Sequence, residues 1–350
     1  MSIKVFDFFS GCGGASKGFQ QAGLEIVLAL DNDPAAADTF AANFKTAHFV
    51  TIDIASVSPD DLEPFFRSCE GSPVLFSGCA PCQPFTKQNT KPKDADVKRT
   101  LLGEFQRFVE YFEPELVFVE NVPGMQKVEG KNGPFDEFVK ALKEHGYHVE
   151  HQIVASQNYG VPQMRRRLIL IASRLGPISF PSKDHGPGTP HPQFATVKEW
   201  IGSLPSIEMG ETHPSDPIHR AAHLSELNLR RIQALSEGQD RTEWADPLKL
   251  RCHTNGYRGH TDVYGRMWWN KPATGLTTRC ISLSNGRFGH PEQDRAISVR
   301  EAARLQTFPM DFVFKGNLAS MARQIGNAVP VLLAQRFGEH FNAHIQECLG

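Results

Sequence analysis

No stretch of this 350-residue sequence is apolar for long enough to cross a membrane, and residues 1–6 show no signal-peptide pattern. The sequence also lacks internal repeats and low-complexity tracts, which argues against a repeat protein or a largely disordered one. Its hydrophobic content of 40% is enough for a large globular domain and a smaller one. We therefore expect a folded cytoplasmic protein that does not bind membranes.

Cysteine is sparse and scattered. The count of seven is odd, and the positions form no regular framework: Cys12, Cys69, Cys79, Cys82, Cys252, Cys280 and Cys348. In a chain without an export pattern such thiols are expected to stay reduced, which again indicates the cytoplasm. A zinc site needs further ligands at suitable spacing, and the CxxC of Cys79 and Cys82 has no matching second pair. We expect no bound metal.

The net charge is only −2 at pH 7, but the charges are unevenly placed. Residues 163–300 contain 19 Lys and Arg against 13 Asp and Glu, a net charge of +6, which leaves −8 for the rest of the chain. A basic segment of this kind is typical of a surface that faces a polyanion. A solvated surface of mixed charges fits the numbers equally well.

Short apolar stretches alternate with amphipathic ones over the first half of the chain. The expected strands are residues 5–9, 26–30, 49–52, 73–76, 116–119 and 167–172. The expected helices are residues 15–22, 34–43, 104–111 and 134–145. This alternation predicts an α/β fold with a doubly wound, mostly parallel sheet, whose ligands bind at the carboxyl ends of the strands.

The first three expected strands each end in a feature that suits an adenosyl cofactor. The first leads into a glycine-rich turn, which allows the backbone to approach a ligand at a helix N-terminus. Asp31 ends the second and has the chemistry to bind ribose hydroxyls. Asp53 ends the third, where it is placed to accept from an adenine amino group. A glycine turn alone is common among α/β proteins, so the inference depends on all three.

A thiol and a carboxylate each follow a buried-strand pattern. Cys82 lies in the segment GCAPCQPFT, directly after the apolar residues 73–76. Glu120 follows the apolar residues 116–119 and opens the segment ENVP. Because parallel strands end at the same edge of a sheet, these side chains suggest a nucleophile with an acid partner. Taken alone, Cys82 also fits a redox pair with Cys79 or a buried structural cysteine.

An arginine cluster, QMRRR, occupies residues 163–167. Such a cluster is commonly a solvated surface or a phosphate contact. Arg167 opens a strand pattern and is placed to point into the same cleft as Cys82 and Glu120.

The α/β pattern stops near Arg174, where residues 175–192 are rich in proline and glycine and predict a linker or an irregular crossing. All four tryptophans follow this stretch: Trp200, Trp244, Trp268 and Trp269. We expect a smaller, loop-rich domain with short strands there. Helical patterns return at residues 299–307 and 319–341.

Six blocks of this sequence resemble the bacterial-type DNA (cytosine-5-)-methyltransferase family, in that family's order and spacing. They are FDFFSGCGGASKGFQQAG (6–23), GCAPCQPFT (78–86), ENVP (120–123), NYGVPQMRRR (158–167), REAARLQTFP (300–309) and QIGNAVP (324–330). The resemblance covers nearly the whole chain, and six blocks together are far more specific than any one of them.

The resemblance implies a role for individual residues. Cys82 is the expected nucleophile and Glu120 the expected acid, Arg165 and Arg167 match arginines that hold the target base, and Asn327 matches a structural residue near the catalytic pocket. The residues expected to contact S-adenosylmethionine are Phe9, Gly11, Gly14, Asp31, Asp53, Ile54, Pro81, Leu101 and Val329. The resemblance also implies a catalytic domain in two parts, residues 1–175 and 298–350, and a target recognition domain at 176–297.

The implied reaction is methyl transfer to carbon 5 of cytosine in a specific duplex sequence. A thiolate that adds to carbon 6 makes carbon 5 nucleophilic, which explains the need for a cysteine. The base must leave the duplex to reach Cys82. The polar run 87–99 is expected to move as a lid over it.

The sequence departs from the family pattern at four positions. Asp31 stands where Glu is usual, Asn32 where a large side chain is often found, Thr86 where Ser is common, and Gly275 where Thr is common. The shorter Asp31 can still accept from a ribose hydroxyl.

Three other functions share features of this sequence: an RNA methyltransferase, a catalytically silent DNA-binding module, and a dinucleotide oxidoreductase. The sizeable segment that bears Trp and Arg favours duplex DNA, and the set of Cys82, Glu120 and Arg167 argues against the other two. We expect a monomer that acts on double-stranded DNA, with a cognate restriction endonuclease acting separately.

Overall fold

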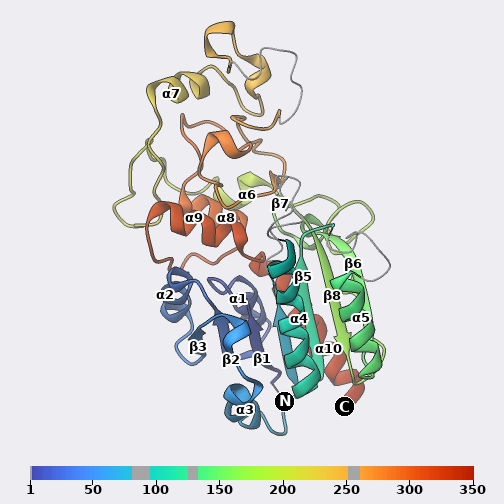
Figure 1. The fold of residues 1–350 in the computed structure, drawn as a ribbon. Coiled ribbons are helices and arrows are strands. Elements are labelled where there is room, and N and C mark those ends of the chain that lie inside the picture. Colours follow the sequence, from blue (N-terminus) through green and yellow to red (C-terminus); the bar gives the residue numbers. More distant parts are fainter. Residues whose placement is uncertain (1, 81–94, 125–132, 251–260) are drawn as a thin grey trace. The chain divides into compact units, whose positions relative to one another are not determined.

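The structure is a computed structural model that describes residues 2–80, 95–124, 133–250 and 261–350. The chain forms two compact units (Figure 1). The first, here called the sheet unit, comprises Met1–Ala155, Arg166–Ser182 and Val329–Gly350. The second, here called the inserted unit, comprises Ser156–Arg165 and Lys183–Ala328. The predicted boundaries at residues 175 and 298 separate a catalytic domain from a target recognition domain. Grouping residues into compact units does not test those roles, so this division stays a prediction.

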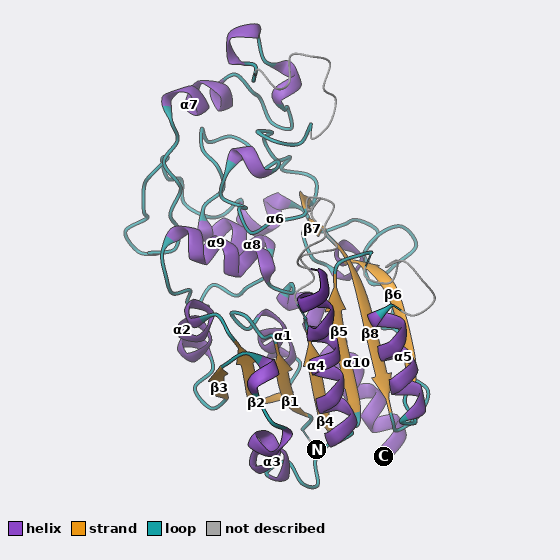
Figure 2. Ribbon diagram, viewed as in Figure 1, coloured by secondary structure: helices purple, strands orange, loops and turns teal. Residues whose placement is uncertain are grey.

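The sheet unit contains one seven-stranded sheet in the order β3-β2-β1-β4-β5-β8-β6 (Figure 2). Its strands are β1 Lys4–Phe8, β2 Glu25–Asp31, β3 His48–Thr51, β4 Val74–Gly78, β5 Leu116–Asn121, β6 His148–Ala155 and β8 Arg166–Ser173. Strands β1 to β5 pair in parallel, and β8 is antiparallel to both of its neighbours. The order reverses at β1, which has β2 on one side and β4 on the other. In such sheets the crevice for ligands opens at this reversal, beyond the carboxyl ends of the strands.

Helices cover both faces of this sheet (Figures 1 and 2). They are α1 Gly14–Gln21, α2 Pro34–Asn43, α3 Pro59–Arg67, α4 Ala95–Phe112, α5 Pro134–Glu144 and α10 Val331–Leu349, with a 3-10 helix, η1 Ile54–Ser56. On one face the rings of Phe105 and Phe108 of α4 lie 5.3 and 5.2 Å from Phe8 of β1. On the other, Phe118 of β5 contacts Phe19 of α1 and Phe337 of α10. Aromatic side chains therefore supply much of the buried apolar area of both layers.

The predicted fold class is confirmed, and every strand expected from the sequence is present within a few residues of its predicted bounds. In the sheet unit, one α-helix and one strand were not expected. Helix α3 carries the signals of a start, since Ser58 and Asp61 form a capping box around Pro59. Strand β6 lies at the sheet edge with most of its side chains exposed, so it lacks the apolar pattern that marks a buried strand.

The inserted unit is rich in loops, as expected. Its helices are α6 Val197–Ile201, α7 Glu226–Gln233, α8 Val299–Leu305 and α9 Leu318–Asn327, with 3-10 helices η5 Ser156–Tyr159, η6 Arg241–Glu243, η7 Asp246–Leu248 and η9 Leu283–Asn285. A two-stranded parallel sheet pairs β7 Gln163–Met164 with β9 Ala273–Thr274. A small core gathers around Ile232, Trp244 and Leu283.

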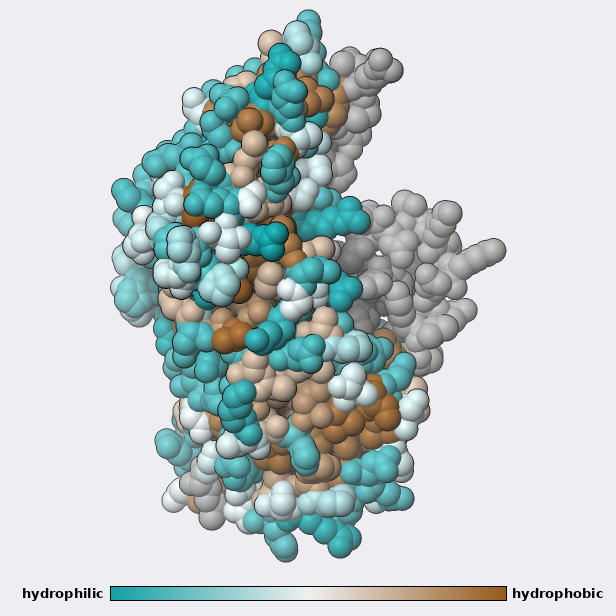
Figure 3. Space-filling view, turned by 90° about the vertical axis from the view of Figure 1, so that its left-hand side faces the viewer, coloured by the Kyte–Doolittle hydropathy of each residue, from teal (hydrophilic) through white to brown (hydrophobic). Residues whose placement is uncertain are grey.

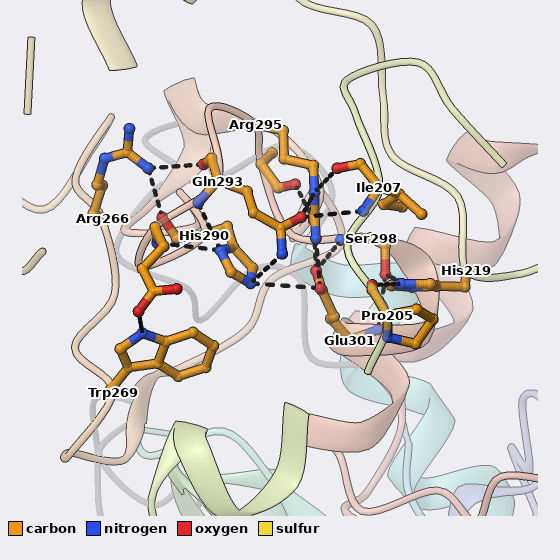
Figure 4. Close-up of polar contacts among 12 residues, drawn as sticks. Pro205, Ile207, His219, Arg266, Trp269, His290, Gln293, Arg295, Ser298 and Glu301 are labelled. Atoms are coloured by element: carbon orange, nitrogen blue, oxygen red, sulfur yellow. Dashed lines mark hydrogen bonds and ion pairs between the residues drawn. The ribbon is translucent and has the colours of Figure 1, made fainter. Parts of the chain in front are cut away.

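A buried polar network supplements this small core (Figure 4). Arg295 donates from two nitrogens to the two carboxylate oxygens of Glu301, each at 2.7 Å, and both side chains are 1% exposed. Burial opposes ionisation of Glu301, but the hydrogen bonds from Arg295 outweigh it and lower the pKa of that carboxyl. Burial lowers the pKa of the neighbouring His290 to about 4, so this imidazole is neutral at pH 7. The network shows that arginines of the basic segment also form hydrogen bonds in the protein interior.

No helix in the described part of the chain has the length and apolar character needed to cross a membrane.

Candidate functional site

The glycine-rich turn after β1 lies at the carboxyl edge of the parallel strands. Phe9, Gly11 and Gly13 all have positive φ angles, of 59°, 53° and 91°. A β-carbon on Gly13 would lie 2.5 Å from a ring carbon of Phe44, so no larger residue fits without movement. Gly14 is buried as the first residue of α1. Of Gly11 and Gly13, only Gly11 has open space where a side chain would lie, so the turn can present its backbone to a ligand at Gly11.

Asp31, the last residue of β2, fixes the shape of this turn. Its Oδ2 accepts a hydrogen bond from the Gly11 N–H at 2.8 Å, and its Oδ1 accepts from the Asp33 N–H at 2.9 Å. Burial raises the pKa of Asp31 above its usual range, while these backbone donors partly oppose the rise. The carboxylate thus has a fixed orientation and retains lone pairs for donors from a ligand.

The next two predicted cofactor residues differ in exposure. Asp53 is exposed, and its Oδ1 accepts from the Ala55 N–H at 3.0 Å at the start of η1. Ile54 is 2% exposed and packs in the core of the sheet unit. Arg107 of α4 donates to the carbonyl oxygens of Ile54 and Val57, which fastens this 3-10 turn to the sheet unit.

Two further predicted contacts lie on other elements of the same unit. Leu101 of α4 is partly buried against the core. Val329, just before α10, is 4% exposed. Pro81, which was predicted to join them, lies outside the described residues.

Glu120 and Arg167 form an ion pair at the carboxyl edge of β5. Because β8 is antiparallel to β5, its first residues lie beside the last residues of β5, and Arg167 Nε is 2.8 Å from Glu120 Oε1. Glu120 is 7% exposed. Within the described residues its Oε1 has no hydrogen-bond partner, because Arg167 lies at ion-pair distance without hydrogen-bond alignment. A buried carboxylate with an unused acceptor beside a cation is suited to receive a donor from a ligand.

Asn121 ties this edge to the segment that precedes Cys82. Its Nδ2 donates to the Ala80 carbonyl at 2.9 Å, and its Oδ1 accepts from the Val122 N–H at 2.8 Å. The side chain is 3% exposed. In the sequence Asn121 stands out only as part of the ENVP motif, whereas in the structure it joins the ends of β4 and β5.

Of the two cysteines in the CxxC motif, the structure describes Cys79 but not Cys82. Burial, followed by the negative charge of Glu120, raises the pKa of Cys79 well above its usual range. Such a thiol stays protonated at neutral pH and is a poor nucleophile. Cys82 lies outside the described residues, as do Thr86 and residues 87–94 of the predicted lid. The nucleophilic role of Cys82 stays a prediction.

A buried acid in β1, Asp7, was not among the predicted site residues. Asp7 of β1 is fully buried, and the Ser16 hydroxyl of α1 donates to its Oδ2. Among the described residues its Oδ1 has no hydrogen-bond partner. Burial raises its pKa to about 6. The available signal was an aspartate inside the otherwise apolar strand sequence VFDF.

The remaining two candidates belong to the inserted unit. Arg165 is 4% exposed, and its Nη1 donates to the carbonyl oxygens of Leu276 and Gly326, both at 3.1 Å. Asn327, the last residue of α9, is exposed. The structure thus places Arg165 next to the residue before Asn327, and it brings Glu120 and Arg167 together within the sheet unit.

Comparison with known sequences gives one family over almost the whole chain. The sequence pattern of the family described as C-5 cytosine-specific DNA methylase matches residues 3–343. The chain is 39% identical over 336 residues to the Type II methylase M.HgiDII of Herpetosiphon aurantiacus, covering 95% of this chain and 92% of that protein. It is 32% identical to the Type II methyltransferase M1.HphI of Haemophilus parahaemolyticus, covering 97% and 86%.

Comparison with solved structures supports the fold. A prophage-encoded protein of E. coli, solved as a candidate DNA modification methyltransferase, superimposes with a TM-score of 0.75 at 23% identity, over 99% of this chain and 100% of that one. The Dnmt2 methyltransferase of S. pombe gives a TM-score of 0.61 at 17% identity, over 99% of each chain.

Proposed function

The chain belongs to the C-5 cytosine-specific DNA methylase family, and on that premise we propose that Cys82, Glu120 and Arg167 carry out its chemistry. The protein is an enzyme that uses S-adenosylmethionine to methylate carbon 5 of cytosine in DNA. An oxidoreductase and a silent binding module are therefore set aside, and the family's description as DNA methylases gives no support to RNA as substrate.

The turn after β1 and its neighbours fit this cofactor. The open space where a side chain on Gly11 would lie leaves room for a ligand to approach, and the fixed carboxylate of Asp31 suits ribose hydroxyls. The exposed Asp53 suits an adenine amino group. The remaining residues proposed to contact the cofactor are Phe9, Gly14, Ile54, Pro81, Leu101 and Val329. When bound, S-adenosylmethionine supplies an electrophilic methyl group on a sulfonium.

The chain's own residues activate the base. The Cys82 thiolate adds to carbon 6 of the flipped cytosine, and negative charge moves onto the ring. Glu120 shares a proton with ring nitrogen 3 and so neutralises that charge, while Arg167 stabilises the carboxylate that remains. After methylation, loss of the carbon-5 proton and elimination of Cys82 restore the aromatic ring and the free thiol.

The observation that carries this proposal is the Glu120–Arg167 ion pair, with a buried Glu120 oxygen that no described residue hydrogen-bonds. Arg167→Met is expected to slow methylation by at least about 10²-fold, the effect of removing one positioned electrostatic group. Arg166→Met is the matched control, since the neighbouring residue of a strand points to the opposite face.

Both variants would be incubated with DNA and S-adenosylmethionine, and converted cytosines would be read by bisulfite sequencing. Wild-type methylation by Arg167→Met at saturating substrate would contradict the proposal. Equal loss in Arg166→Met would show that charge near the site, and not the ion pair, matters.

We propose that the inserted unit reads duplex DNA. The burial of its arginines limits which of them can contact phosphates. Within the described residues of the basic segment, seven arginines are at least 93% buried: Arg165, Arg231, Arg241, Arg266, Arg287, Arg295 and Arg300. Arg220, Arg230 and Arg279 are exposed. Hydrophilic residues predominate on the surface of this unit in the upper half of Figure 3. The number of phosphate contacts is therefore smaller than the arginine count suggests, and so is the expected salt dependence of binding.

Residues 176–297 are proposed as the target recognition domain within the catalytic residues 1–175 and 298–350. Moving residues 176–297 into a related methyltransferase should carry the target sequence with them, as bisulfite sequencing would show. A folded, active chimera that keeps the host's target would overturn this division. By analogy with its Type II relatives we further propose a monomer that acts in the cytoplasm on double-stranded DNA, beside a separate restriction endonuclease.

A further inference from the structure

Two glutamines of the inserted unit are fully buried and bonded to each other. Gln163 lies in β7 and Gln306 follows α8, and both are 0% exposed. Gln163 Nε2 donates to Gln306 Oε1 at 2.9 Å. A buried amide is costly unless its donors and acceptors are used, so the remaining bonds of this pair show what it holds in place.

Gln306 holds the backbone on both sides of Asn327. Its Nε2 donates to the Ile325 carbonyl at 2.7 Å and to the Ala328 carbonyl at 3.1 Å. The carbonyls at the end of a helix lack partners within the helix, so a side-chain donor at this point defines how the chain leaves α9. The exposed Asn327 lies between the two anchored residues.

Gln163 holds a second segment against the same helix end. Its Oε1 accepts from the Leu276 N–H at 2.8 Å, and Arg165 donates to the Leu276 carbonyl. A β-carbon on Gly326 would lie 2.1 Å from the Thr277 carbonyl oxygen, so the two backbones are in direct contact. The exposed Arg279 follows two residues later.

We propose that Gln163 and Gln306 are positioning residues for methyl transfer, which fix Asn327 and Arg279 in one mutual geometry through their shared hydrogen bond. This inference rests on the expected place of Asn327 near the catalytic pocket and on the proposed DNA-reading role of the inserted unit, which carries the exposed Arg279. Glutamine suits the task because it donates and accepts without adding a charge beside the buried Arg165.

Gln306→Glu tests the proposal with little change of volume. The ionised side chain still accepts from Gln163 but cannot donate to Ile325 or Ala328. We expect the rate of covalent adduct formation with fluorocytosine duplex DNA, per site that binds S-adenosylmethionine, to fall at least tenfold. The dissociation constant for S-adenosylmethionine should stay within twofold, because the proposed cofactor residues belong to the sheet unit.

Acid should partly restore Gln306→Glu, since a protonated carboxyl can donate again, whereas Gln306→Met should stay slow at every pH. Gln324→Met is the matched control. Gln324 is also buried in α9, and its Nε2 donates to the Lys315 carbonyl and the Ser320 hydroxyl. Gln324→Met is expected to lower the melting temperature without slowing adduct formation. Should Gln306→Glu not fold, Gln163→Glu keeps the bonds from Gln306 to α9 and the acceptor for the Leu276 N–H but cannot donate to Gln306, so it tests the hydrogen bond between the two glutamines.

A folded Gln306→Glu with the wild-type adduct rate, or an equal loss in Gln324→Met, would overturn the inference. Asn327→Ala, measured beside it, separates this result from the proposed function. If Asn327→Ala is slow and Gln306→Glu is not, the inference alone fails. If Asn327→Ala reacts at the wild-type rate, the proposed role of Asn327 fails and the inference fails with it.

Discussion

Removal of the Asp31 carboxylate should loosen the cofactor turn and weaken S-adenosylmethionine binding. Asp31 accepts from the Gly11 and Asp33 N–H groups at 2.8 and 2.9 Å. A hydrogen bond to a charged group is worth about 1.5–3 kcal/mol, so two bonds set an upper limit of about 3–6 kcal/mol. The side chain is partly exposed, so we expect Asp31→Ala to lower the free energy of unfolding by about 2–3 kcal/mol.

The same change should raise the dissociation constant for S-adenosylmethionine about 5- to 150-fold, which corresponds to about 1–3 kcal/mol. Calorimetric titration measures this constant, and denaturant titration measures the stability. Asp33→Ala is the control. Asp33 caps α2 through the Ala35 N–H at 3.1 Å, so its loss should cost about 1 kcal/mol of stability and leave cofactor binding unchanged.

The pH dependence of binding gives a second test of Asp31. Burial raises its pKa, and the ionised form is the stronger acceptor for ribose hydroxyls. Affinity for S-adenosylmethionine should therefore fall as the pH is lowered toward that raised pKa, and Asp31→Asn should lack this fall. A wild-type dissociation constant in Asp31→Ala, or equal weakening in Asp33→Ala, would refute the assignment.

Three further predictions concern the sheet unit. Glu120→Gln should slow methyl transfer by about 10²-fold or more, the scale of one positioned general acid, with unchanged S-adenosylmethionine affinity in calorimetry. Weaker cofactor binding with normal turnover would instead assign Glu120 to the cofactor site. Burial raises the pKa of Asp7 from its ordinary value of 3.8 to about 6 in the folded state, so its stabilising contribution is complete below about pH 4 and is lost as the pH rises through about 6. Relative to Asp7→Asn, the wild type should lose up to about 3 kcal/mol of unfolding free energy between pH 4 and 7 in denaturant titrations, and parallel pH profiles would contradict this. Gly18→Ala should lower the free energy of unfolding by about 1–3 kcal/mol, because the new β-carbon would lie 2.3 Å from the Val331 carbonyl oxygen. Gly103→Ala in α4 has open space around it and should raise the free energy of unfolding by up to about 1 kcal/mol. Equal melting temperatures for the two variants would argue against this packing.

The alternation of buried strands and helices was predictable because parallel strands buried on both faces read as continuous apolar runs. Glu120 could be placed at a strand end for the same reason. What the sequence does not state is strand direction. Arg167 reaches Glu120 because β8 runs antiparallel to β5, and a strand pattern reads alike in both directions.

The role of individual arginines was also out of reach of sequence. Counting charges treats Arg279 and Arg295 alike, yet one is exposed and the other lies in a buried ion pair with Glu301. Arg165 was expected to hold the target base; that contact stays a prediction, while the structure shows bonds from its side chain to Leu276 and Gly326. Leu276 and Gly326 lie more than 100 residues from Arg165 in the sequence, so no local pattern reveals these contacts.

The most direct test of the central claim is to trap the covalent intermediate. DNA that carries 5-fluorocytosine in the methylated site would be incubated with the enzyme and S-adenosylmethionine, and the adduct digested and mapped by mass spectrometry. We predict a denaturation-stable adduct on the peptide that contains Cys82, absent in Cys82→Ser, although that variant still binds DNA. An unchanged adduct in Cys82→Ser, or one mapped to Cys79, would contradict the account.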